Sequence, residues 1–196
     1  MADQSDKFLR RKKQQLSKPD RSLKQDWDDK ILNLCEKINK LDNYYTTSSC
    51  SGRVLVLKDV KEKKDDVIIG VWHDKINIEL LKGRLNNIEY KGIIYFKCEP
   101  CILHVACRTL EDAQKFIDLA SKIAGWKRYG IITSGRRFVV EINGTERIEF
   151  PIVNKGKVIV SNDFLKLIVD ESNEKIEASW KKIQKLEESI NSLEDS

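Results

Sequence analysis

The sequence lacks the usual marks of a membrane or secreted protein and of the commonest enzyme classes. No apolar stretch is long enough to span a bilayer, and the first residues are charged and polar rather than those of a signal sequence. There is no phosphate-binding P-loop, no glycine-rich dinucleotide fingerprint, no nucleophile elbow and no pair of histidines at metal-binding spacing. We therefore expect a cytoplasmic protein whose chemistry no common catalytic motif reveals.

Cysteine is scarce as well, and odd in number. The 5 cysteines are spread over 196 residues, which argues against a disulfide scaffold and fits reduced thiols packed as small apolar groups. No segment resembles a flexible interdomain linker. The length therefore predicts a single compact domain over residues 1–196.

The most informative segment is a hydroxyl-rich stretch that ends in glycine and arginine. It reads Thr47-Ser48-Ser49-Cys50-Ser51-Gly52-Arg53 and precedes the apolar run Val54 to Leu57. Small hydroxyls, a glycine free to adopt unusual backbone angles and a fixed cation together suit a phosphate, a carboxylate or a ribose. An ordinary polar loop between a helix and a strand has the same composition. Taken alone, the segment favours the loop.

Much of this pattern returns 83 positions later, as Thr133-Ser134-Gly135-Arg136 before another strand-like run. A helical pattern precedes each copy, at Asp28 to Asp42 and at Glu111 to Gly125. This predicts a degenerate internal duplication of helix, Gly-Arg loop and strand, with the two loops facing each other across a cleft. Around it we expect an α+β fold with a mixed sheet and flanking helices, a hairpin at Asn143-Gly144, and an amphipathic carboxy-terminal helix over 171–196.

Basic residues gather near the amino terminus and around the second loop. Residues 1–25 form a basic arm, in which Asp20 is the only acidic residue between Lys7 and Lys24. Such an arm either lies along a phosphate backbone or is a solvated terminus. Lys127 and Arg128 form a second cluster with Arg136 and Arg137, which favours a nucleic-acid ligand.

One spacing imitates a zinc site. Cys98, Cys101, His104 and Cys107 recur every third residue. Because side chains alternate along a strand, His104 would face away from Cys101 and Cys107, and we predict no metal. His104, or His73 at the end of another strand, could instead serve as a general base.

The string Tyr44-Tyr45-Thr46-Thr47-Ser48-Ser49-Cys50-Ser51-Gly52-Arg53, together with His73, Glu99-Pro100, Ile102 to Val105 and Ser134-Gly135, resembles the tRNA wybutosine-synthesising protein 3 family. The resemblance covers nearly the whole chain. It implies S-adenosylmethionine-dependent methylation of a ring nitrogen in the tricyclic wyosine-type base next to the anticodon, at position 37 of phenylalanine tRNA. The implied fold is not a Rossmann-type methyltransferase.

Physical requirements of that reaction assign roles to residues of this chain. We expect His73, with His104 second, to remove a proton from the target nitrogen, and Tyr45 to stack on the tricyclic base. Glu99 would hold the ammonium group of the donor. The donor's carboxylate and ribose would meet Ser48, Ser49, Ser51, Arg53, Ser134 and Arg136. The same groups could equally grip tRNA phosphates.

The remaining tRNA contacts are assigned to the basic residues. A non-catalytic RNA-binding module is the alternative function, and it predicts tRNA binding without affinity for the methyl donor. We expect no stable protein partner. The basic residues expected to contact tRNA are Arg10, Arg11, Lys12, Lys13, Lys127 and Arg128.

Overall fold

The computed structural model describes residues 2–18, 28–60, 67–86, 88–134 and 137–193, and it confirms the expected α+β class. In chain order the elements are α1 (Ala2–Leu16), α2 (Asp29–Lys40), β1 (Tyr44–Cys50), β2 (Arg53–Lys58), β3 (Ile68–Trp72), α3 (Ile78–Leu85), β4 (Ile94–Glu99), β5 (Ile102–Cys107), α4 (Leu110–Asp118), β6 (Arg128–Ser134), β7 (Arg137–Asn143), β8 (Ile148–Asn154), β9 (Lys157–Val158) and α5 (Asn162–Ser189). A π-helical turn follows α4 at Leu119–Ile123, and a 3₁₀ turn follows α5 at Ile190–Leu193.

The chain forms two compact units that are interleaved along the sequence. Unit 1 comprises Met1–Ser51, Ile102–Gly144 and Trp180–Ser196, and unit 2 comprises Gly52–Cys101 and Thr145–Ser179. Each unit has its own sheet, and all strand pairs within the two sheets are antiparallel. Single-domain behaviour of the whole chain stays a prediction.

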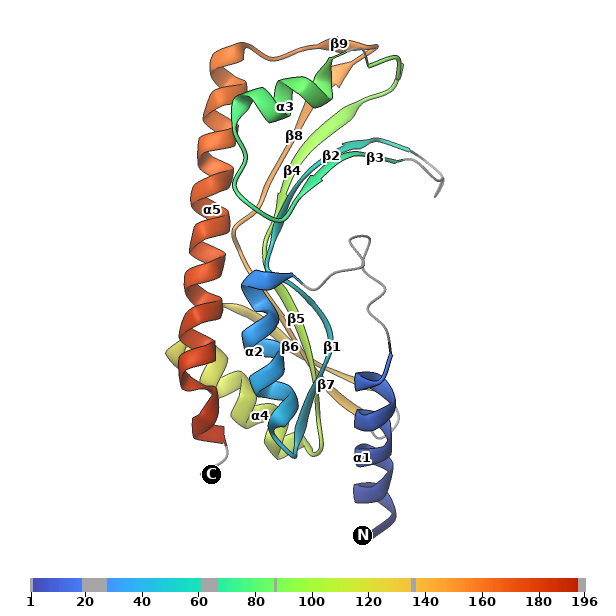
Figure 1. The fold of residues 1–196 in the computed structure, drawn as a ribbon, viewed down its shortest axis with the longest axis vertical. Coiled ribbons are helices and arrows are strands. Elements are labelled where there is room, and N and C mark those ends of the chain that lie inside the picture. Colours follow the sequence, from blue (N-terminus) through green and yellow to red (C-terminus); the bar gives the residue numbers. More distant parts are fainter. Residues whose placement is uncertain (1, 19–27, 61–66, 87, 135–136, 194–196) are drawn as a thin grey trace. The chain divides into compact units, whose positions relative to one another are not determined.

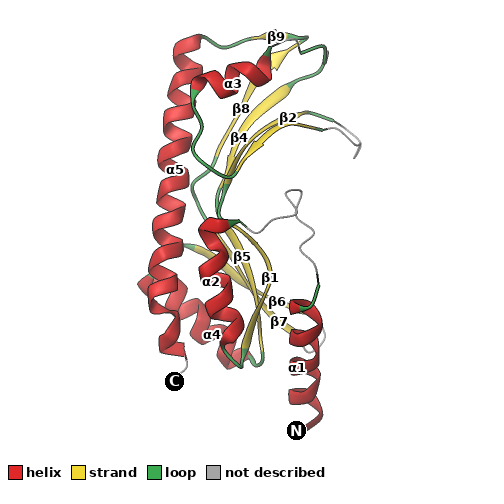
Figure 2. Cartoon of the chain, viewed as in Figure 1, coloured by secondary structure: helices red, strands yellow, loops and turns green. Residues whose placement is uncertain are grey.

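Unit 1 is built on a four-stranded sheet in the order β1-β5-β7-β6. Helices α2 and α4 cover one side of this sheet and α1 lies on the other (Figure 2). The apolar face of α2 is buried, and Asp28 caps the helix by accepting a hydrogen bond from the backbone N–H of Lys30. Thr109 and Asp112 close a capping box at the start of α4. The covered side of the sheet is therefore a conventional apolar core.

Unit 2 is built on a five-stranded sheet in the order β3-β2-β4-β8-β9. Helix α3 and the first part of α5 lie on one side of it (Figure 1). Side chains of β4 alternate between buried and half-buried positions, which is the period of a strand with one covered face. The side chain of Asn173 on α5 accepts a hydrogen bond from the backbone N–H of Ile76 at 2.9 Å and donates one to the carbonyl of Ile76 at 2.8 Å. Asn173 therefore fixes the chain that leads into α3.

One local expectation was wrong: most of the Thr47–Arg53 stretch is not a loop, since β1 extends to Cys50 and pairs with β5. The basic arm is helical from Ala2 to Leu16, while 19–27 lie outside the described residues. The carboxy-terminal helix is part of α5, which begins before residue 171, at Asn162.

The hairpin at Asn143-Gly144 and the symmetry of the duplication also fail. β7 pairs with β5 and β6, whereas β8 pairs with β4 in the other sheet. Likewise β6 turns back onto β7, but β1 is followed by β2 in the other sheet. The sequence marks correctly where the chain turns, but long-range packing determines which strands pair with each other.

Candidate functional site

One face of the unit 1 sheet gathers polar side chains from strands far apart in sequence. The pairing register sets Ser48 beside His104 and His104 beside Glu141, so β1, β5 and β7 each contribute one polar group to a row. Leu103 and Val105, which flank His104 on β5, point to the opposite side and are fully buried. We call the face that carries this row the outer face.

A bulge in β1 decides which side chains reach the outer face. Tyr45 pairs with Ala106 and Ser48 with His104, with a register shift between Thr46 and Ser48. In a regular strand, residues 45 and 48 would point to opposite sides. The extra residue of the bulge brings Tyr45 and Ser48 to the same side.

His104 and Glu141 form an imidazole–carboxylate pair on this face. Nε2 of His104 lies 2.8 Å from Oε2 of Glu141, and the two side chains are 23% and 40% exposed. A carboxylate accepts hydrogen bonds only, so this contact places a proton on Nε2 and leaves Nδ1 of the neutral ring as an acceptor. The pair has the arrangement of a general base whose tautomer is fixed by a second residue.

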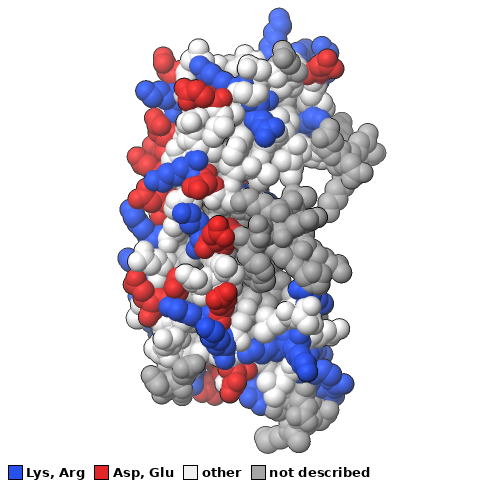
Figure 3. All heavy atoms as spheres, viewed as in Figure 1, with Lys and Arg blue, Asp and Glu red and all other residues white. Residues whose placement is uncertain are grey.

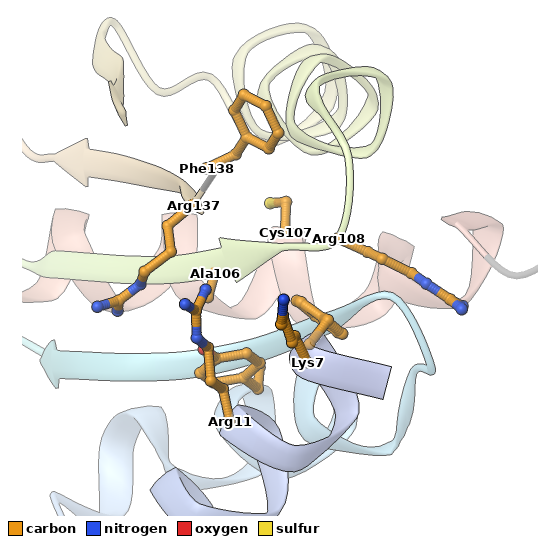
Figure 4. Close-up of a pocket in the computed structure, with 9 residues that line it drawn as sticks. Lys7, Arg11, Ala106, Cys107, Arg108, Arg137 and Phe138 are labelled. Carbon is orange, nitrogen blue, oxygen red and sulfur yellow. The ribbon is translucent and has the colours of Figure 1, made fainter. Parts of the chain in front are cut away.

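Helix α1 crosses the outer face and forms a cationic pocket beside this row. Phe8 is buried against Tyr45, with the ring centroids 5.3 Å apart, and both rings pack with Ala106 and Val139. A cavity of about 320 Å³ opens here, lined by Lys7, Phe8, Arg11, Tyr45, Ala106, Cys107, Arg108, Arg137 and Phe138. Lys7 and Arg11 extend from α1 toward β5, whereas Arg108 extends away from them (Figure 4).

Tyr45 forms the base of this pocket rather than a stacking platform. Its side chain is buried and packs against the tilted ring of Phe8, so stacking on a nucleobase would require α1 to move. Burial raises the pKa of the Tyr45 hydroxyl, while the charges of Arg137 and Arg11 and a hydrogen bond from Arg137 oppose that shift.

The other predicted tRNA contacts divide into exposed and structural groups. Arg10, Lys13, Lys127 and Arg128 are exposed, and Figure 3 shows basic side chains gathered over α1. Lys12 is different: its ammonium donates to the carbonyl of Leu41 and holds α1 against the body of unit 1. Burial lowers the pKa of Lys12, and nearby Asp42 partly offsets this. Lys12 therefore has a structural task of its own.

The serines of the hydroxyl-rich stretch have unequal environments. Ser48 is exposed on the outer face, while Ser49 is half-buried and partly offsets the rise that burial causes in the pKa of the Cys35 thiol. Ser51 is fully buried; its backbone N–H donates to Oδ2 of Asp28 at 2.7 Å. Its Oγ is buried without a hydrogen-bond partner among the described residues. Orphaned buried hydroxyls are rare and indicate a place for a ligand group or a water.

In unit 2, three of the predicted residues come together at one end of the sheet. Arg53 pairs with Glu99 across β2 and β4, and its Nε and Nη2 both reach Oε2 of Glu99 at 2.8 Å. The β2–β3 ladder ends at the pair Val54 and Trp72, and half-buried His73 follows directly, next to the Arg53 position. Glu99 therefore orients the guanidinium of Arg53, a role that the sequence did not indicate.

At Gly52 the chain passes close to the backbone of the residues that immediately precede Cys101. The φ of Gly52 is +107°, and a Cβ at this position would lie 3.1 Å from the carbonyl oxygen of Glu99. Only glycine combines that backbone conformation with so close an approach. In the Gly-Arg part of the motif, the backbone conformation thus requires glycine at the first position, and the arginine at the second position forms an ion pair.

Some predicted residues receive no account from the structure. Ser134 ends β6, and nothing is described of its side chain; Arg136 lies outside the described residues.

His104 and Cys107 lie on opposite faces of β5, as strand alternation predicted, and the buried Cys107 thiol donates to the carbonyl of Val105. Within the described residues, no helix is both long and apolar enough to span a membrane.

The sequence did not indicate Glu141 as a member of the candidate site, and it placed Lys7 and Arg137 only within the two basic clusters. Glu141 lies 37 residues from its partner His104, and only the β5–β7 register unites them. Alternation within Arg137–Asn143 could have put Arg137 and Glu141 on one face, although not which face.

Comparison with known proteins gives one consistent family. The family described as methyltransferase TYW3 matches residues 6–192. A Pyrococcus furiosus protein named tRNA(Phe) 7-((3-amino-3-carboxypropyl)-4-demethylwyosine(37)-N(4))-methyltransferase 1 is 34% identical over 193 residues, covering 96% of this chain and 97% of that protein. A Thermococcus sibiricus protein with the same name, without the final numeral, is 37% identical over 169 residues and 85% of each chain.

Solved structures agree with these sequence matches. The PH1069 protein from Pyrococcus horikoshii has a TM-score of 0.86 and 33% identity, with 96% of both chains covered. A hypothetical protein from Aeropyrum pernix has a TM-score of 0.72 at 21% identity, covers 85% of this chain and 98% of its own, and shares the fold.

Proposed function

Because this chain belongs to the methyltransferase TYW3 family, we propose that it transfers a methyl group from S-adenosylmethionine to a ring nitrogen of the tricyclic wyosine-type base at position 37 of phenylalanine tRNA. The observation that carries this proposal is the outer face of unit 1. It combines a hydroxyl, a carboxylate-oriented imidazole and an adjacent cationic pocket, which are the groups that a proton-bearing base attached to an anionic backbone requires.

S-adenosylmethionine supplies a methyl group on a sulfonium, which the target nitrogen attacks in line. The protein accelerates such a displacement mainly by holding nitrogen, methyl carbon and sulfur collinear in a site that excludes water. Rigid sheet positions suit this task, because Ser48 and His104 are held by the β1–β5 ladder on both sides of their pair.

The imidazole of His104 supports the acid–base part of the mechanism. With its Nε2 proton donated to Glu141, Nδ1 can take the proton that the target nitrogen loses as it gains the methyl group. We propose His104 for this role, with His73 of unit 2 as the alternative. His104 is favoured because a second residue fixes its tautomer.

Two independent features support binding of the methyl donor by the hydroxyl-rich motif. In unit 1, the Oγ of Ser51 is buried without a hydrogen-bond partner among the described residues, and Ser48 offers an exposed hydroxyl. In unit 2, Arg53 is held by Glu99 through two of its five N–H donors, so the remaining donors are pre-oriented toward a carboxylate. Each feature is a candidate for the donor on its own geometry: we propose Ser48 and Ser51 in unit 1 and, separately, Arg53 in unit 2, with Glu99 acting through Arg53.

Calorimetry with S-adenosylmethionine alone tests this assignment without any tRNA. We expect Arg53→Ala and Ser51→Ala each to weaken donor binding about tenfold, since a hydrogen bond to a charged group contributes about 1.5 to 3 kcal/mol. Lys166→Ala, at an exposed position on α5, serves as the matched control. Unchanged affinity in Arg53→Ala would assign that guanidinium to tRNA phosphates instead.

The reaction itself is tested by mass spectrometry of digested nucleosides. The protein is incubated with isotopically labelled S-adenosylmethionine and phenylalanine tRNA that carries the unmethylated tricyclic base. We expect that nucleoside to gain the mass of one labelled methyl group. Retention of tRNA binding without methyl gain would favour the non-catalytic RNA-binding module.

A further inference from the structure

The pocket under α1 has the composition of an anion site. Lys7 and Arg11 from α1 and Arg137 from β7 share its rim, and none of the residues that line it is acidic. Basic side chains gathered at one rim create a local positive potential, which favours an anionic ligand there. All three side chains are exposed at the rim, so a ligand can reach them from solvent.

The geometry of the pocket is held by apolar contacts rather than by the cations. Phe8 anchors α1 against Tyr45 and Ala106, which sets Lys7 and Arg11 one helical turn apart over the sheet. Arg137 lines the same pocket as Tyr45, and its charge opposes the rise that burial causes in the pKa of the Tyr45 hydroxyl. Lys7 and Arg11 are thus positioned over the sheet before any ligand arrives.

The position of the pocket ties it to the proposed reaction. Ala106, which lines the pocket, is two residues from His104 on the same face of β5, a distance of about 7 Å at the rise of an extended strand. Arg137 is separated from Glu141 by two such steps along β7. A nucleotide whose base meets His104 therefore brings its flanking backbone to Lys7, Arg11 and Arg137.

We infer that Lys7, Arg11 and Arg137 bind a backbone phosphate beside the nucleotide whose base reaches His104. This inference rests on the proposed function and adds the subsite at which the anticodon-loop backbone is held. The same chemistry would suit the carboxylate of the aminocarboxypropyl side chain in the substrate named for the relatives, so the test must separate the two anions.

Binding of two tRNAs separates them. The protein is titrated with an unmodified phenylalanine tRNA transcript, which has no aminocarboxypropyl group, and with tRNA that carries it, over a range of salt concentrations. We expect Arg137→Ala and Lys7→Ala each to weaken binding of both tRNAs about tenfold and to lower the salt slope by about one phosphate contact. Lys185→Ala, at an exposed position of α5 in the same unit, is expected to bind like the wild type.

The possible results of these tRNA titrations lead to different conclusions. A loss confined to the tRNA with the aminocarboxypropyl group would overturn the phosphate assignment, and wild-type binding by both Arg137→Ala and Lys7→Ala would overturn the subsite. Lys7→Ala guards against misfolding, because it replaces an exposed helical side chain by a good helix former. Wild-type protein that fails to bind either tRNA would count against the proposed function itself, which keeps the two failures distinct.

Discussion

Phe8→Ala is expected to release α1 from the outer face while leaving the rest of unit 1 folded. The Phe8 side chain is only 9% exposed, and its ring lies between Tyr45, Ala106 and Val139. Truncating a buried phenylalanine to alanine costs about 3 to 5 kcal/mol in a protein core. Because α1 lies at the surface and Lys12 still bonds to Leu41, we take the lower end of that range.

A loss of about 3 kcal/mol raises the open fraction of a local equilibrium roughly 100-fold. Isolated helices of this length are marginal in water, so α1 should fray when it is no longer packed. Hydrogen exchange with mass spectrometry measures this directly. We expect α1 amides to lose about two orders of magnitude of protection, while amides of β5 and β7 keep theirs.

Leu9→Ala is the matched control, since Leu9 is the next residue along α1 and is 45% exposed. We expect it to change protection by less than about 0.5 kcal/mol. Affinity for tRNA should fall in Phe8→Ala but not in Leu9→Ala, because only the former frees Lys7 and Arg11 from their positions over the sheet. Wild-type exchange of α1 in Phe8→Ala would refute the argument that this ring holds the helix.

Three other predictions concern the imidazole–carboxylate pair, a buried thiol and the glycine of the motif. Glu141→Gln should lower kcat roughly 10- to 100-fold with little change in KM for tRNA, because Glu141 acts only by positioning the His104 ring. In a double variant with His104→Ala it should therefore cause little further loss of kcat. Additive losses in steady-state kinetics would contradict this. Burial raises the pKa of the Cys35 thiol from 9.0 to about 11, so its contribution to stability is complete below pH 9 and is lost as pH rises toward 11. Urea titrations at pH 8 and pH 11 measure this loss. Between the two pH values, the free energy of unfolding should fall by about 2 to 3 kcal/mol less in Cys35→Ala than in the wild type. Gly52→Ala should lower the free energy of unfolding by about 1 to 3 kcal/mol through its positive φ and the nearby Glu99 carbonyl, whereas Gly83→Ala, within α3 and with nothing near its added Cβ, should be neutral or stabilising in the same urea titration.

The sequence predicted best those elements whose signals are local. The helical pattern over Asp28 to Asp42, which contains α2, was found because it depends on neighbouring residues. Strand β1 was missed because serine and threonine favour turns when judged alone, and only pairing with β5 makes them a strand.

The candidate site was predicted in its residue types but not in its geometry. Ser48 and His104 were both named, yet nothing local shows that they are paired neighbours or that Glu141 is the third member of their row. Tyr45 was named for stacking, whereas Phe8 already covers it. The one-residue bulge between Thr46 and Ser48 decides which side chains share a face, and a bulge leaves no clear mark in a sequence.

The bulge also explains why one short string serves several purposes at once. Before it, Tyr45 points to the outer face and packs under α1, near the charge of Arg137. After it, Ser48 points to the same face but toward His104, so the anchor of the cationic pocket and the polar row become neighbours. Removing the extra residue would turn Tyr45 away from Phe8 or Ser48 away from His104. Deletion of Thr47 should therefore abolish either docking of α1 or methyl transfer even in a folded protein, and a deletion variant that retains both would show that the bulge does not set this arrangement.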